Sequence, residues 1–169
     1  MEYRILETKE QKFLAIVGRF SNAIVNDDNN HDIPDFWDAC GSQGIIEQLQ
    51  NLRPQGKRDL YGLCSPAEAG EETFAYGIGI LVDEETASFD LEEMTKAGFS
   101  IWDVEPGTYA VFDCVGENGD CIGKTWAYFY QEFLPNTGYK MENRTDYEIY
   151  FDNSKVGLFC QLWIPIKAE

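Results

Sequence analysis

The apolar positions of this chain recur in the same order twice. The first copy has a strand-like run at residues 13–17, a helical pattern over 33–52, and strand-like runs at 60–63 and 74–80. The second copy has a strand-like run at 108–112, a helical pattern over 121–134, and strand-like runs at 147–151 and 158–166. Short β-branched and aromatic runs indicate strands, whereas apolar positions three and four apart indicate helices.

The repeated order predicts an α+β fold, built as a tandem pseudo-twofold repeat of a β-α-β-β module. Each half is expected to have an antiparallel sheet and one main helix. We expect a single domain over residues 1–169, with repeat one at 1–82, an acidic connector at 83–98 and repeat two at 99–169. We expect a groove where the two halves meet, and interfaces of this kind are preferred places for small-molecule sites.

Local signals refine the helices. The first pattern begins after Asp32 with a proline at position 34, a helix-start signal, and Gly41 and Gly44 predict a kink in its middle. Pro135 is expected to end the second helix. Within the connector, residues 91–96 are expected to form a short helical turn.

The charge of the chain excludes several partners. The formal net charge is −17, from 13 basic and 30 acidic residues. Direct binding to nucleic acid needs a basic surface, as does binding to an anionic membrane, so we expect neither. The acidic excess favours solubility, or attraction of cationic ligands and basic partners.

The cysteines and the single histidine bear on compartment and cofactors. Five cysteines without a CxxC pair, and no signal peptide, predict a reduced cytoplasmic protein. With His31 as the only histidine, we expect no metal and no other cofactor. The segment 119–125 resembles a phosphate-binding loop, but the glycine required five residues before Gly123 is replaced by Asn118.

Glu148 is the leading candidate for chemistry. It lies in the run 147–151, where strand alternation places it with Tyr150 on one face and Tyr147 with Ile149 on the other. A buried carboxylate among aromatic rings is unfavourable without a partner, so a buried Glu148 would indicate a ligand site. On a solvated face it would have no such meaning, and both interpretations remain open from the residues alone.

The order of several motifs resembles a known family. The motifs are a Gly107 run ending in Tyr-Ala-Val-Phe, a helix with Trp126 and Tyr130, a Tyr-Glu-Ile-Tyr strand, and a Trp-Ile-Pro-Ile terminus. Together they look like the gyrase-inhibitor-like small-molecule-binding domain, also called the AraC-type effector-binding domain. The resemblance implies two tandem β-α-β-β modules and either a stand-alone protein or a sensor whose partner is another polypeptide.

The resemblance also implies a site. Relatives that sense many drugs, including transcription activators, use a strand glutamate in an aromatic pocket to bind lipophilic cations, and Glu148 matches that glutamate by position. The candidate walls are Phe36, Trp37, Tyr61, Tyr76, Tyr150 and Trp163. Trp163 stands where the family often has tyrosine.

Three functions remain open. The first is cytoplasmic binding of an apolar small molecule, neutral or cationic. The second is a hydrolase that detoxifies an electrophilic, cyclopropanoid-type compound, with Glu148 as the catalytic acid or base. The third is a gyrase-inhibitor-like protein that acts on a protein partner.

Overall fold

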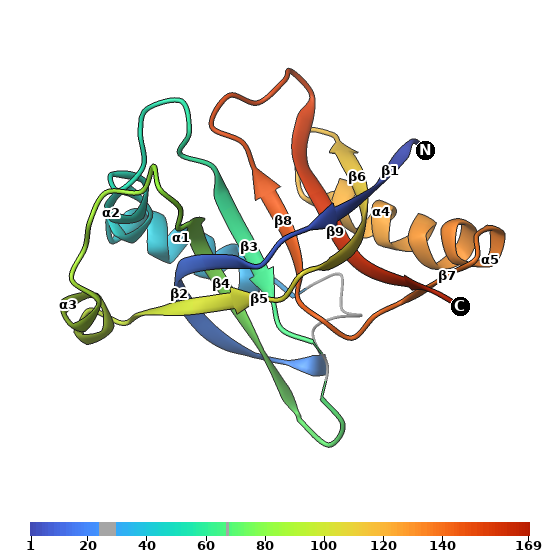
Figure 1. Cartoon of the computed structure of the whole chain (residues 1–169), viewed down its shortest axis with the longest axis horizontal. Coiled ribbons are helices and arrows are strands. Elements are labelled where there is room, and N and C mark those ends of the chain that lie inside the picture. The colour runs from blue at the N-terminus through green and yellow to red at the C-terminus, as the bar shows by residue number, and fades with distance from the viewer. Residues whose placement is uncertain (24–29, 67) are drawn as a thin grey trace.

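The computed structural model describes residues 1–23, 30–66 and 68–169. Its first part contains β1 (Tyr3–Thr8), β2 (Gln11–Ser21), α1 (Asp32–Ser42), α2 (Ile45–Gln50), β3 (Leu60–Cys64) and β4 (Thr73–Leu81). After α3 (Leu91–Lys96), its second part contains β5 (Phe99–Val104), β6 (Gly107–Val115), α4 (Asp120–Tyr128), a π-helical turn (Phe129–Phe133), α5 (Leu134–Asn136), β7 (Tyr139–Met141), β8 (Asp146–Tyr150) and β9 (Leu158–Ala168). Figure 1 shows this order along the ribbon.

The helices follow the sequence patterns, with two interruptions. The first pattern is divided into α1 and α2 at Gly44, whose φ of 75° lies in the left-handed region that glycine tolerates. The second pattern continues from α4 through the π-helical turn into α5. The short helix expected at residues 91–96 is confirmed as α3, and the Asp90 side chain accepts hydrogen bonds from its first backbone amides.

The strands form one antiparallel sheet with the order β1-β6-β9-β8-β3-β4-β2-β5, and β7 also pairs with β9. The mixed α+β architecture expected from the sequence is confirmed. Strands β3 and β8 meet at the middle of this order, where Gly62 lies opposite Glu148. The first strand of each part pairs in the other part, because β1 joins β6 and β5 joins β2. The superposition of two halves as structural repeats stays a prediction.

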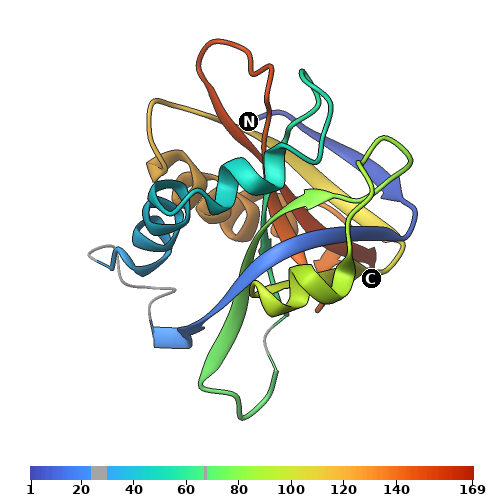
Figure 2. The ribbon, with the colours of Figure 1, turned by 90° about the vertical axis from the view of Figure 1, so that its left-hand side faces the viewer.

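The helices cover one face of the sheet (Figure 2). Under α1 the core includes Cys40, Tyr76 and Ile78, whereas under α4 it includes Phe112 and Leu162. No helix in the described part of the chain has the length and hydropathy needed to cross a membrane.

On the face without helices, the curled sheet encloses a second hydrophobic core. Its buried cluster contains Phe13, Ala15, Tyr61, Leu63, Val104, Tyr109, Val111, Tyr147 and Ile149. Phe13 of β2 and Tyr147 of β8 are not on neighbouring strands, yet their rings lie 6.2 Å apart. The sheet therefore curls until strands that are three places apart in its order share one core. Gly77 permits this closure, because a Cβ there would lie 3.1 Å from the Trp102 ring.

Candidate functional site

Glu148 lies on β8 at the centre of the sheet, on the face that carries the helices. Its neighbours across the strands are Gly62 of β3 and Leu162 of β9. The alternation expected from the sequence is confirmed, since Tyr147 and Ile149 belong to the cluster on the opposite face. Glu148 nevertheless retains some solvent-accessible surface. A carboxylate that is closely surrounded but still accessible can meet a ligand.

Two phenols hold one oxygen of this carboxylate. The hydroxyl of Tyr150 donates to Glu148 Oε1 at 2.8 Å, and the hydroxyl of Tyr76 donates to the same atom at 3.0 Å. Among the described residues, no hydrogen bond reaches Oε2. The phenols therefore orient the side chain through Oε1 and leave Oε2 as the acceptor for another group.

Trp37 extends this arrangement to α1. Its indole Nε1 donates to the hydroxyl oxygen of Tyr76 at 3.0 Å. The Trp37 ring also meets Tyr150 edge to face, with ring centroids 5.0 Å apart. One helix and two strands thus supply three aromatic side chains around one carboxylate.

Gly62 makes this close approach possible. A Cβ at position 62 would lie 2.8 Å from Glu148 Oε1 and even closer to the Tyr76 hydroxyl. Neither atom belongs to a freely moving side-chain end, because both are joined by a hydrogen bond. The glycine on β3 is therefore part of the site, although it offers no functional group.

The electrostatics oppose ionisation of the cluster. Burial raises the pKa of Glu148, and the hydrogen bonds from Tyr150 and Tyr76 offset part of this effect. Burial and the nearby Glu148 charge raise the pKa of Tyr76 and of Tyr150, so both phenols remain protonated donors at neutral pH. In the described part of the chain, no basic side chain forms an ion pair with Glu148. A cationic ligand would supply the missing positive charge.

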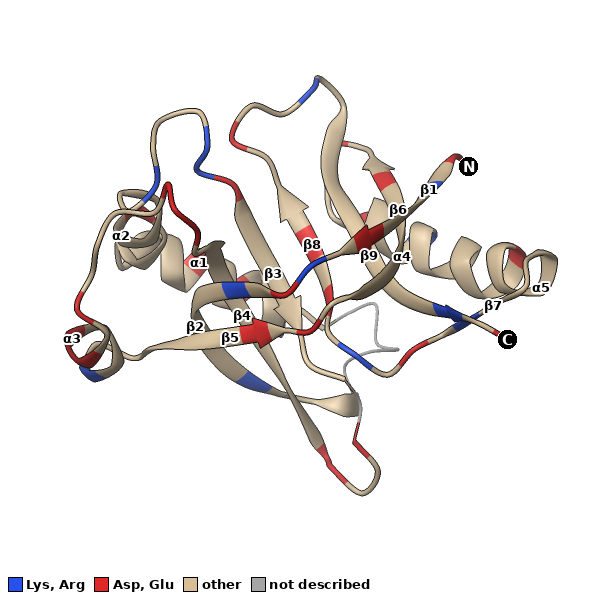
Figure 3. Cartoon of the chain, viewed as in Figure 1, with Lys and Arg blue, Asp and Glu red and all other residues tan. Residues whose placement is uncertain are grey.

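A second acidic residue lies on the same strand. Asp146 is two residues before Glu148, on the same face, and opposite Cys64 of β3. Burial raises the pKa of Asp146 well above its ordinary range, and the charge of Glu148 raises it further. Figure 3 shows acidic positions on β8 in the middle of the sheet. Asp146 was not among the residues predicted from the sequence, although the strand alternation that indicated Glu148 also places residue 146 on the same face.

The structure brings together only some of the predicted residues. Trp37, Tyr76 and Tyr150 surround Glu148, and Phe36 lies on the same helix as Trp37, with its ring 5.4 Å from that of Phe20. Tyr61 and Trp163 lie on the opposite face of the sheet.

These two rings belong to the enclosed core instead. Trp163 stacks on Tyr147 with centroids 5.5 Å apart, and the ring of Tyr61 lies 4.7 Å from that of Phe13. The expectation that Tyr61 and Trp163 share a cavity with Glu148 is therefore corrected. Trp163 lies opposite Tyr147, and Tyr61 lies opposite Ile149, so both rings face away from the carboxylate.

Neither a metal cluster nor the cleft beside β1 coincides with Glu148. The described residues contain no group of three or more His, Cys, Asp or Glu side chains able to hold a metal. An open cleft of about 670 Å³ lies between β1, β6 and α4 and includes Met1, Arg4, Asp113 and Lys124. This cleft offers exposed chain-end residues and charges of both signs, whereas Glu148 offers a desolvated carboxylate with aromatic neighbours.

The curved antiparallel sheet, with helices on one face, is the architecture of gyrase-inhibitor-like small-molecule-binding domains. The profile of the family described as integron-associated effector binding protein matches residues 4–166. The chain belongs to this family.

Relatives and solved structures agree with this assignment. A DNA gyrase inhibitor of Serratia proteamaculans (strain 568) is 28% identical over 115 residues, which cover 68% of this chain and 71% of the relative. The structure of SAV2435 bound to tetraphenylphosphonium has a TM-score of 0.75 at 19% identity, covering 99% of this chain and 94% of the other. A bacterial transcription regulation protein from Staphylococcus aureus MU50 has a TM-score of 0.71 at 20% identity, covering 99% of both chains. At these identities the structural likeness establishes the fold.

Proposed function

We propose that this protein binds a lipophilic cation at Glu148, on the helix-covered face of the sheet. The single observation that carries the proposal is a buried carboxylate with no basic partner among the described residues, one oxygen of which is fixed by Tyr76 and Tyr150. The fold neighbour bound to tetraphenylphosphonium supports the same ligand class.

Physical chemistry favours a cation that is also apolar. A carboxylate in a desolvated setting gains more from a positive charge than an exposed one, because water screens the pair less. The rings of Trp37 and Tyr150 offer their own attraction for a cation, about 0.5–2 kcal/mol for each well-placed ring. An apolar surface on the ligand lowers the cost of entering this setting.

Ligand binding of this kind serves effector sensing, and we place it in the cytoplasm. The five cysteines are free thiols in the structure, which suits a reducing compartment. The ligand signal would reach transcription or another process through a partner protein.

The test compares tetraphenylphosphonium with the neutral triphenylphosphine oxide by isothermal titration calorimetry. Glu148→Gln preserves the side-chain shape and removes the charge. We expect it to weaken phosphonium binding by at least tenfold, or about 1.4 kcal/mol, and to change binding of the neutral compound little. Glu47→Gln, at an exposed position on α2, is the matched control.

Equal phosphonium affinity in Glu148→Gln and in the unchanged protein would contradict the proposal. A phosphonium-binding site that responds to Glu47→Gln as strongly as to Glu148→Gln would also contradict it, because the effect would then reflect net charge alone. Product formation from an electrophilic ligand, lost in Glu148→Gln, would instead identify a hydrolase.

A second candidate function is inhibition of DNA gyrase through a protein–protein interaction. It is favoured by the 28% identical relative described as a DNA gyrase inhibitor. A supercoiling assay with purified gyrase tests it directly. Inhibition by this protein that persists in Glu148→Gln would show a protein-binding function independent of the ligand site.

A further inference from the structure

The site contains a second carboxylate whose spacing from the first is set by the strand. Asp146 and Glu148 are successive residues on the same face of β8, so their backbone positions are about 7 Å apart. Both side chains retain some accessible surface. A ligand held at Glu148 therefore lies within reach of a second negative group.

The described residues leave this pair of acids without a positive charge. No lysine, arginine or histidine in residues 1–23, 30–66 and 68–169 forms an ion pair with either carboxylate, although seven ion pairs form elsewhere in those segments. The backbone amide of Asp146 acts to lower the pKa of its own carboxyl group, against the larger effect of burial, and the carboxylate keeps acceptor capacity for another group. Where a bound cation favours the ionised form of both acids, one monocation would neutralise only half of the pair.

Aromatic rings surround Glu148, and a second aromatic pair lies in the helical segment that covers the same face of the sheet. Glu148 has Trp37 and Tyr150, as described above. On the other side, Trp126 and Tyr130 stack with centroids 5.9 Å apart and planes inclined by 21°. Trp126 packs against the same buried cluster as Tyr150, so this pair lies on the face of the sheet that carries the two acids. Burial raises the pKa of Tyr130, and the charge of Asp146 raises it further.

We propose that Asp146 makes the site selective for rigid aromatic dications whose positive centres lie about 7 Å apart, the spacing of two residues along a strand. The inference rests on the proposed function, since it assumes that Glu148 binds the first positive centre. A bipyridinium fits this description, because its two ring nitrogens lie at a similar separation across a flat aromatic frame. Each nitrogen would compensate one carboxylate, while the rings of the ligand would meet those of α1 and the π-helical turn.

The test uses methyl viologen as the dication and tetraphenylphosphonium as the monocation, both by calorimetry. Asp146→Asn is expected to weaken methyl viologen binding at least tenfold and to change phosphonium binding less than threefold. Glu148→Gln is expected to weaken both. Asp38→Asn, at an exposed position on α1, is the matched control and should change neither.

Thiol modification gives a second readout, which is independent of calorimetry. Cys64 lies opposite Asp146 and is partly exposed, whereas the other four cysteines are buried. Methyl viologen at saturation should slow alkylation of Cys64, as followed by mass spectrometry, and the protection should disappear in Asp146→Asn. Thermal unfolding of each variant shows whether it is folded.

The outcomes separate the two proposals. Phosphonium binding that depends on Glu148, together with equal effects of Asp146→Asn on both cations or on neither, would overturn the dication inference alone. Unprotected Cys64 at saturating methyl viologen would also overturn it. No binding of either cation would overturn the proposed function and this inference together.

Discussion

At the scale of single residues, the site combines a fixed oxygen and a free one on the same side chain. Tyr76 and Tyr150 orient Glu148 before any ligand arrives, so little side-chain freedom remains to be lost on binding. Gly62 makes room for this arrangement. The desolvated carboxylate lowers the free energy of unfolding of the ligand-free protein, and such a loss of stability is typical of functional sites.

Because the buried carboxylate destabilises the protein, its replacement by a neutral side chain should be stabilising. Burial raises the pKa of Glu148, so the folded state binds its proton more tightly than the unfolded state does. The wild-type protein therefore loses stability as pH rises from the unfolded pKa through the folded pKa. Glu148→Gln removes this loss and should increase the free energy of unfolding at pH 7, with a smaller gain at pH 5. Urea unfolding at the two pH values measures it.

A variant less stable than the wild type at pH 7 would contradict this account of Glu148. So would a difference that stays constant between pH 7 and pH 5. Glu47→Gln again serves as the control, since its exposed side chain should change stability little at either pH.

At the scale of elements, the sequence predicted the long strands, both main helices and the break near Gly44, because each has a strong local pattern. Strands β1 and β5 were missed. The segment 99–104 is rich in aromatic and β-branched residues, and this strand-like composition could have identified β5. The three-residue β7 and the π-helical turn have no comparable signal. Their conformations are set by pairing with β9 and by packing, which local propensity does not encode.

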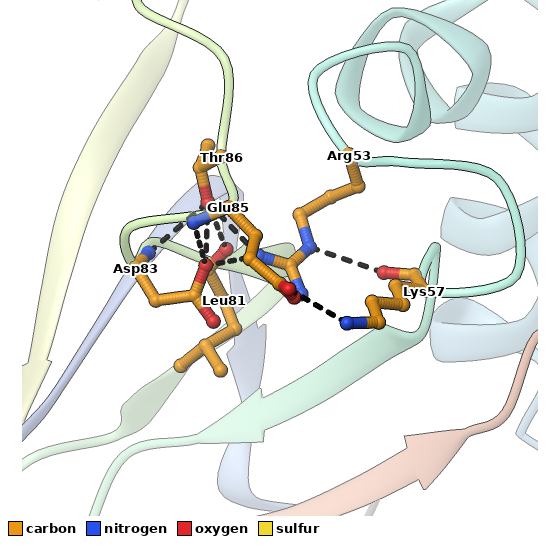
Figure 4. A network of polar contacts seen from close by, with 6 residues as sticks. All are labelled: Arg53, Lys57, Leu81, Asp83, Glu85 and Thr86. Atoms are coloured by element: carbon orange, nitrogen blue, oxygen red, sulfur yellow. Dashed lines mark hydrogen bonds and ion pairs between the residues drawn. The ribbon is translucent and has the colours of Figure 1, made fainter.

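Element ends depend on polar contacts, as the turn after β4 shows. The buried guanidinium of Arg53 contacts Asp83, donates to Thr86 Oγ1 at 3.1 Å and donates to the Lys57 carbonyl at 3.1 Å (Figure 4). Lys57 forms a further ion pair with Glu85 at 2.6 Å. This network holds the turn after β4 against the segment that follows α2.

Loss of the Arg53–Asp83 pair should destabilise the fold. Burial acts to raise the pKa of Asp83, but hydrogen bonds from the Glu85 amide and from Arg53 outweigh it and lower the pKa. This carboxylate therefore stabilises the protein above its unfolded pKa, and the stabilisation is lost as pH falls through the folded pKa. Asp83→Asn should cost about 1.5–3 kcal/mol at pH 7 and much less at pH 3, as measured by urea unfolding.

The exposed pair between Lys12 and Asp103 provides the control. Both side chains are more than half exposed, so Asp103→Asn should change stability by less than about 1 kcal/mol. Equal effects of Asp83→Asn and Asp103→Asn would mean that burial of Arg53 adds nothing to the first pair.

At the scale of the whole molecule, strand order creates the site. Pairing of β3 with β8 joins the first and second parts of the chain and places Gly62 beside Glu148, 86 positions apart in sequence. At the two edges of the sheet, β1 pairs with β6 and β5 pairs with β2, and these pairings also join the first part of the chain to the second. Local patterns could predict that Glu148 alternates with Tyr147. They could not predict that Tyr61 and Trp163 would share the face of Tyr147, because that depends on register between distant strands.

The most direct test of the central claim is a crystal structure of the complex with tetraphenylphosphonium. We expect the phosphonium centre to lie beside Glu148 Oε2 and its phenyl rings to contact Trp37 and Tyr150, while Tyr76 keeps its hydrogen bond to Oε1. A phosphonium seated in the cleft between β1, β6 and α4, with Glu148 untouched, would contradict it.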